Sequence, residues 1–72
     1  MRLIDVNNLK KLKIVEISDA NLAYRLNDFG FIKEAEIEIL SRTKGMYLIR
    51  VSNSVYAIND CLARIINVEE FM

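Results

Sequence analysis

The residues best suited to chemistry are three closely spaced glutamates, Glu34, Glu36 and Glu38. Alternate positions of a strand share one face, so Glu36 and Glu38 would present two carboxylates that could bind a divalent cation or exchange protons. Hard cations are usually held by a loop that wraps around them, and a strand face does not wrap. We therefore interpret these carboxylates as a solvated face, whose charge keeps the strand from pairing with other chains.

Histidine is absent from the sequence, and Cys61 is its one cysteine. The lack of imidazole excludes histidine-based triads, Cys–His dyads and histidine metal ligands. A single thiol cannot assemble a zinc or iron–sulfur site within one chain. We expect Cys61 to be a small buried apolar residue, with a reactive thiol as the alternative. The sequence therefore predicts no enzyme activity, no cofactor and no metal site.

Composition and charge restrict the class of partner. The 72 residues predict a single domain over residues 1–72, and 53% of them are hydrophobic, which supplies a dense core for this length. Ten basic and ten acidic residues cancel, so the positive excess that binds nucleic acid is missing. We interpret the locally basic Lys10-Lys11-Leu12-Lys13 as a solvated entry to a strand.

The sequence also indicates where the protein is found. No run of about 18 uncharged apolar residues is present, so we expect no insertion into a membrane. The residues before Asp5 contain no apolar stretch typical of a signal peptide. A lone cysteine suits a reducing compartment, and we expect a cytoplasmic protein.

One short helix is predicted over about residues 19–29. Asp19 can cap its start, because a short oxygen side chain accepts from the unpaired amides of a first turn. Gly30 can end it, because glycine readily adopts the left-handed conformation found after helices. The expected buried face repeats at helical spacing and consists of Leu22, Leu26 and Phe29.

Five short strands are predicted from alternating apolar and polar residues. The alternation of the first strand is interrupted by Val15, and Asn53 is expected to take a positive φ in the turn at 52–54. The apolar residues that define the strands are Leu12, Ile14 and Ile17, then Ala35, Ile37 and Ile39, then Tyr47, Ile49 and Val51, then residues 55–58, and finally residues 65–68.

Five short strands, tight turns and one helix predict an all-β fold, a small and strongly bent antiparallel barrel. Closure into a barrel removes exposed strand edges, and we expect the helix to cover one open end. Before the last strand, Asn59 and Asp60 are expected to cap a single helical or 3₁₀ turn that reaches Ala63. Residues 69–72 are expected to fray.

Four apolar residues are candidates for binding a partner. If Tyr47, Ile49 and Val51 point inward, their neighbours on the same strand point outward. Exposed apolar side chains that cluster mark interaction sites, whereas scattered ones are ordinary. The candidate partner-binding residues are Tyr24, Met46, Leu48 and Val55.

Several segments, taken in order, resemble the FeoA family of small proteins associated with bacterial ferrous iron uptake. The resemblance covers nearly the whole chain. Its motifs are Arg25-Leu26-x-x-x-Gly30-Phe31, Ile37-x-Ile39, Ile49-x-Val51, Tyr56-Ala57-Ile58 and Ala63-x-x-Ile66-x-Val68.

The chain departs from the family pattern at four positions. The family usually has glycines where this sequence has Leu9, Glu34 and Asn53, and an arginine where it has Asn59. Asparagine is the residue that best replaces glycine at a positive φ, whereas a glutamate there is a harsher change. The shape of the turn at Glu34, and any charged contact at Asn59, are therefore open.

The resemblance implies an SH3-like barrel of about five strands. It also implies a non-catalytic, cytosolic accessory or regulatory protein that binds FeoB, the membrane transporter of ferrous iron, which carries a cytosolic GTP-binding domain. The alternative is a regulatory module related to the C-terminal domain of iron-dependent transcriptional repressors, which share this fold. A homodimer is compatible with either function, because exposed apolar strands often self-associate.

Overall fold

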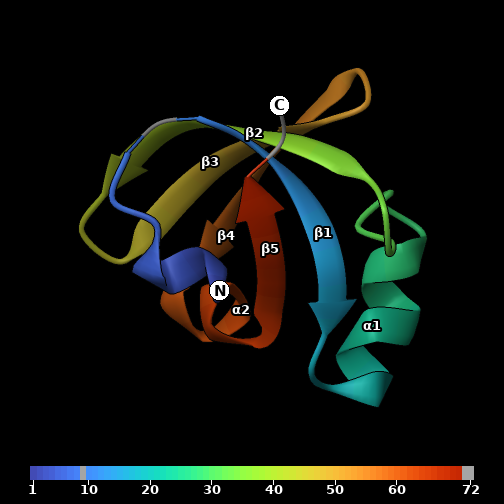
Figure 1. Cartoon of the computed structure of the whole chain (residues 1–72). Helices are drawn as coiled ribbons and strands as arrows, with labels where there is room; N and C mark the ends of the chain where they lie inside the picture. The colour runs from blue at the N-terminus through green and yellow to red at the C-terminus, as the bar shows by residue number, and fades with distance from the viewer. Residues whose placement is uncertain (9, 71–72) are drawn as a thin grey trace.

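A computed structural model describes residues 1–8 and 10–70 of the chain. The family-glycine position Leu9 and the fraying expected at Phe71 and Met72 lie outside the described residues. The elements, shown in Figure 1, follow the order η1 (Leu3–Asp5), β1 (Lys11–Ile17), α1 (Ala20–Asn27), β2 (Glu36–Thr43), β3 (Met46–Val51), β4 (Ser54–Asn59), α2 (Asp60–Ile65) and β5 (Ile66–Glu70).

The five strands form one antiparallel sheet in the order β4-β3-β2-β1-β5. The sheet is strongly bent, and α2 links its two outermost strands at one end of the barrel (Figure 1). The predicted all-β, SH3-like barrel is therefore confirmed. Within residues 1–8 and 10–70, however, no ladder joins β4 to β5, so a seam remains where full closure was expected.

The core is the inner face of this one sheet. Alternate residues of every strand point inward, as the period of two requires. The described residues include no buried polar or charged side chain. The buried strand residues are Leu12, Ile14, Ile37, Ile39, Tyr47, Ile49, Val51, Ile58, Ile66 and Val68.

Two β-bulges bend the sheet. The pairing of β1 with β5 shifts between Ile14 and Glu16, and the pairing of β2 with β3 shifts between Ile39 and Ser41. Each bulge leaves one extra residue on its strand, which increases the local twist and bend. The first bulge explains why Val15 interrupts the alternation of its strand, because this residue has no partner and lies exposed.

Helix α1 begins and ends as the sequence predicts. An Asp19 Oδ1 atom accepts a hydrogen bond from the Leu22 amide at 3.0 Å. Gly30 adopts a φ of 93°, its amide donates to the Asn27 carbonyl, and the Phe31 amide donates to the Leu26 carbonyl, each at 3.1 Å. These two bonds form a Schellman motif, which typically brings together apolar residues such as Leu26 and Phe31, both buried here.

The buried face of α1 is narrower than expected. Leu26 is buried, but Leu22 is half-buried and Phe29 is 50% exposed. The helix ends at Asn27, so Phe29 lies in the following turn, where its ring packs edge-on against Tyr56 at a centroid distance of 5.4 Å. The expectation of a buried Phe29 was therefore wrong. Helix α1 stands beside β1 (Figure 1) and reaches the core through Leu26.

Helix α2 is longer than the single turn expected before the last strand. It spans Asp60–Ile65, so the described part of the chain contains two α-helices where one was predicted. Asn59 caps it as expected, because its side-chain oxygen accepts from the Leu62 amide at 3.0 Å. Ala63 is fully buried in the core. Neither described α-helix has the length and apolar character needed to cross a lipid bilayer.

The N-terminal residues cover the outer edge of β5. The Val68 amide donates to the Met1 carbonyl at 2.7 Å, and Arg2 forms an isolated bridge with Asn67. Leu3 and Val6, which follow these contacts in the chain, are buried in the core. The lead-in before β1 is therefore part of the barrel.

Among residues 1–8 and 10–70, two non-glycine residues occupy the left-handed region of φ. They are Glu34, at 77°, and Ser52, at 56°. The first is the position at which the family usually has glycine, and the chain keeps the turn there, with the Glu34 amide donating to the Ile14 carbonyl at 2.8 Å. In the β3–β4 turn, the positive φ falls on Ser52, so the expectation for Asn53 was wrong.

We predict that Glu34→Gly stabilises the protein by about 1 kcal/mol, because it removes the steric cost of a side chain at positive φ. The exposed ion pair between Glu34 and Lys13, at 3.6 Å, contributes little. Urea unfolding followed by circular dichroism measures the change. Glu34→Ala is the matched control, because it removes the ion pair but keeps the strain, and its stability should stay close to wild type. Equal stabilities of the glycine and alanine variants would contradict the prediction.

The pairing of β1 with β5 ends in an ion pair that perturbs one carboxyl group. The Lys10 ammonium donates a hydrogen bond to Glu70, and this bond with the positive charge holds the pKa of the Glu70 carboxyl below its ordinary value. A pKa lowered by folding gives a stabilisation that is present at neutral pH and is lost as the pH falls through the lowered value. We predict that Lys10→Met raises the pKa of Glu70, as measured by carbon NMR titration. An unchanged titration midpoint would show that the ion pair does not form.

Candidate functional site

Three of the four predicted partner-binding residues share one face of the sheet. Met46 and Leu48 point outward from β3, and Val55 points outward from β4. Leu48 is directly opposite the exposed Ala57, and Val55 is diagonal to it across the same ladder. We call these four residues the β3–β4 patch.

The fourth predicted residue, Tyr24, belongs to a different surface. It lies on α1, which packs against β1, and its side chain is 82% exposed. None of the aromatic contacts of the described residues involves it. The structure therefore groups Met46, Leu48 and Val55 and leaves Tyr24 apart.

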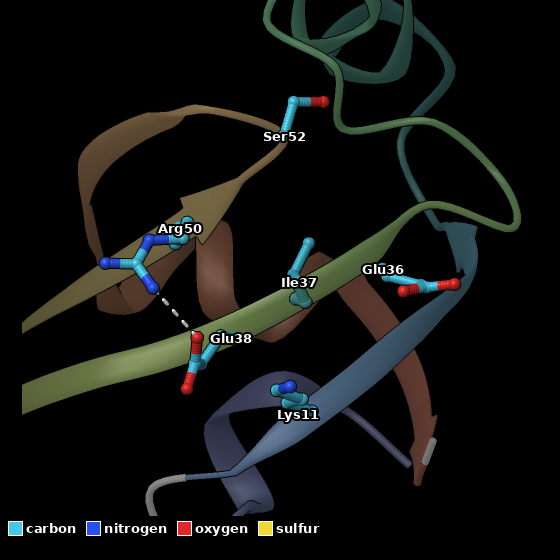
Figure 2. A pocket seen from close by; sticks show the side chains of 6 residues that line it. All are labelled: Lys11, Glu36, Ile37, Glu38, Arg50 and Ser52. Atoms are coloured by element: carbon cyan, nitrogen blue, oxygen red, sulfur yellow. Dashed lines mark hydrogen bonds and ion pairs between the residues drawn. The ribbon is translucent and has the colours of Figure 1, made fainter. Parts of the chain in front are cut away.

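A shallow depression of about 130 Å³ lies beside the patch on the outer face of β1, β2 and β3 (Figure 2). Across it, Lys11 is opposite Glu38, and Glu38 is opposite Arg50. An Arg50 Nη1 atom lies 3.2 Å from a Glu38 Oε1 atom. The lining residues are Lys11, Glu36, Ile37, Glu38, Arg50 and Ser52.

The charges of this depression alternate in sign, which limits its chemistry. Glu38 is paired with a guanidinium, and the carboxylates of Glu36 and Glu38 extend in different directions (Figure 2). Among the described residues, no three metal-ligating side chains are grouped closely enough to hold an ion. Glu38 thus forms a cross-strand ion pair on a solvated face, and Glu36 is exposed to solvent.

Cys61 is exposed, contrary to the expectation of a buried residue. It stands in the first turn of α2, whose core-facing residue is Ala63, with Leu62 and Ile65 packed partly against the core. Residues two apart on a helix point in widely different directions. The burial of Ala63 therefore turns Cys61 to solvent.

An apolar groove of about 200 Å³ was not predicted from the sequence. It runs between the turn after α1, strand β4 and helix α2. Its lining contains no charged residue and consists of Leu26, Phe29, Phe31, Tyr56, Ala57, Ile58 and Leu62. The contributing segments are up to 36 residues apart in the sequence, as from Leu26 to Leu62. The sequence feature that could have indicated this groove is a pair of aromatic residues near the ends of predicted elements. Phe29 ends the predicted helix, and Tyr56 lies near the start of the predicted strand at 55–58.

Comparison with known proteins identifies the family. A family model described as the FeoA domain matches residues 1–70. The chain belongs to the FeoA family. Among curated proteins, no sequence matches this FeoA-family chain.

Solved structures share the same fold. A FeoA protein from Chlorobium tepidum has a TM-score of 0.87 at 15% identity, and the match covers 100% of this chain and 71% of that one. An iron uptake regulatory protein (FeoA) has a TM-score of 0.81 at 26% identity, covering 94% and 93%. A manganese-dependent transcriptional repressor has a TM-score of 0.87 at 17% identity, covering 99% of this chain and 36% of the repressor.

We predict that the Glu38–Arg50 pair contributes little to stability, because water reaches both side chains, which are 35% and 52% exposed. In a double-mutant cycle of Glu38→Ala and Arg50→Ala, the coupling energy from urea unfolding should be about 0.2–1 kcal/mol. The coupling should also decrease when the salt concentration is raised. A coupling of several kcal/mol, unaffected by salt, would show that the pair supports the fold.

Proposed function

We propose that this FeoA-family chain is a non-catalytic, cytosolic accessory protein of bacterial ferrous iron uptake, which acts by binding the cytosolic part of a FeoB-type transporter. The observation that supports this most is the family match over residues 1–70. A protein of this kind needs a surface for a partner and needs no reactive site.

The β3–β4 patch suits such a partner. Leu48 lies at the centre of the patch and is 39% exposed, with Met46 and Val55 nearby and Ala57 directly opposite. Apolar residues at the centre of an interface carry most of its binding energy, while polar neighbours exclude water around them. The alternating charges of Lys11, Glu38 and Arg50 border the patch and would form part of that polar rim.

The described residues give no support to an enzyme. Catalysis by acid–base or nucleophilic groups requires a nucleophile, a base and an orienting group within reach of one another. Cys61 is exposed, and the glutamates Glu34 and Glu38 lie in ion pairs with Lys13 and Arg50. The likeness to the repressor, at 17% identity, shows the fold alone and does not favour the repressor-like function.

We predict that Leu48→Asp weakens binding to the cytosolic domain of a FeoB-type transporter by at least about thirtyfold, as expected for a central anchor worth about 2 kcal/mol or more. Folding should lose less than about 1 kcal/mol, because Leu48 is already partly exposed. Isothermal titration calorimetry measures binding and urea unfolding measures stability.

The matched control is Val15→Asp, because Val15 is 38% exposed and lies on β1, away from the patch. This variant should bind as tightly as wild type. Wild-type affinity of Leu48→Asp would reject the patch as the contact surface, and no binding by the wild-type chain would reject the proposed function. Sedimentation velocity shows whether the patch instead pairs two copies of the chain.

A further inference from the structure

We propose that the free edge of β4 and the adjoining apolar groove bind an extended, uncharged segment of the partner polypeptide, which adds to the sheet as a sixth strand. This inference rests on the proposed function and names how the partner binds. It concerns the edge of β4, whereas the β3–β4 patch is on the outer face of the sheet.

The backbone of β4 offers unpaired hydrogen-bonding groups. A two-residue turn joins β3 to β4, so the residues that flank it, Val51 and Ser54, are hydrogen-bonded to each other. Hydrogen-bonded and non-hydrogen-bonded pairs then alternate along the two strands. Val55 and Ala57 belong to the non-hydrogen-bonded pairs. The amides and carbonyls of Val55 and Ala57 therefore point away from β3. Within residues 1–8 and 10–70, β4 pairs with no other strand.

The two edges of the sheet differ in their protection. The edge of β5 is covered by the N-terminal residues, with the Val68 amide bonded to the Met1 carbonyl, and the strand ends in Glu69 and Glu70. In the part of the chain that the structure describes, no strand pairs with the outer edge of β4, and Ser54–Asn59 contains no charged residue, glycine or proline. Proteins usually protect an exposed edge with such features, so an unprotected edge is suited to pairing with a strand.

The apolar groove follows this edge. Tyr56, Ala57 and Ile58 are consecutive residues that all line it, although consecutive side chains of a strand point to opposite faces. The strand must therefore present its edge to the groove. Phe29 also lines the groove, and its ring packs edge-on against that of Tyr56, with their planes at 69°.

The charge of the groove determines the chemistry of its occupant. No charged residue lines it, so a charged side chain that entered would lose its hydration without gaining a partner. Elsewhere the sheet alternates charges, as in the Lys11–Glu38–Arg50 row. The complementary segment is thus uncharged, has an apolar side chain facing the groove, and meets the Val55 and Ala57 backbone with its own amides and carbonyls.

Ala57→Pro tests the backbone contact, because proline removes the outward amide and leaves the ladder with β3 intact. We expect binding to the cytosolic part of a FeoB-type transporter to weaken at least tenfold by calorimetry, while Ala57→Ser, which keeps the amide, binds as wild type. Phe29→Ala tests the groove wall and should weaken binding at least fivefold. Its matched control is Ile32→Ala, a similarly exposed apolar residue outside this groove.

The outcomes separate the two proposals. If the wild-type chain binds and both Ala57→Pro and Phe29→Ala bind equally well, the strand-addition mode is overturned and the proposed function stands. If the wild-type chain does not bind, both are overturned. If Ala57→Pro fails to fold by circular dichroism, Phe29→Ala alone decides. If sedimentation shows a wild-type dimer that Ala57→Pro dissociates, the occupant is a second copy and the proposal is overturned.

Discussion

The structure depends on one constraint: a single sheet must bury its own inner face. A flat sheet of five short strands could not do so, because nothing else in the chain is large enough to cover it. The bulges after Ile14 and Ile39 bend β1 and β2, and the inner side chains then pack against one another across the barrel. The apolar side chains can be buried only if the sheet bends, and their burial in turn stabilises the bent sheet.

Because the sheet curls without a ladder between β4 and β5, it keeps two outer edges in the described residues, and these edges have different surroundings. The N-terminal residues cover β5, and the packing of η1 with α2 closes that end of the barrel. Phe29, Tyr56 and Leu62 gather beside β4, but they leave its backbone edge without a strand. The edge of β4 thus lies beside two apolar surfaces, the groove and the β3–β4 patch.

The sequence predicts most of the fold because its signals are local. Asp19 and Gly30 set the limits of α1, and alternation identifies all five strands, including the outward positions of Met46 and Leu48. The exposure of Cys61 depends on the direction in which α2 packs, and the exposure of Phe29 depends on the end of α1 at Asn27. Neither is encoded in the spacing of apolar residues.

The candidate site is predicted only in part, because surfaces combine distant segments. Met46, Leu48 and Val55 come from one hairpin, so their shared face follows from strand pairing alone. The groove joins Leu26 to Leu62 across the seam of the barrel, and this meeting depends on how the sheet curls. Likewise, the positive φ at Ser52 depends on the type of the hairpin turn, which composition does not specify.

The bulges also restrict how the length of such a chain can vary. Removal of Val15 or Leu40 would restore regular pairing with every later residue still on its own face, but it would take away the local bend that lets the sheet curl. The inner side chains of the straightened strand would then lose the contacts that they make across the barrel. Insertions and deletions are consequently tolerable at the connections, such as Lys44–Gly45, while β1 and β2 must keep their exact residue count.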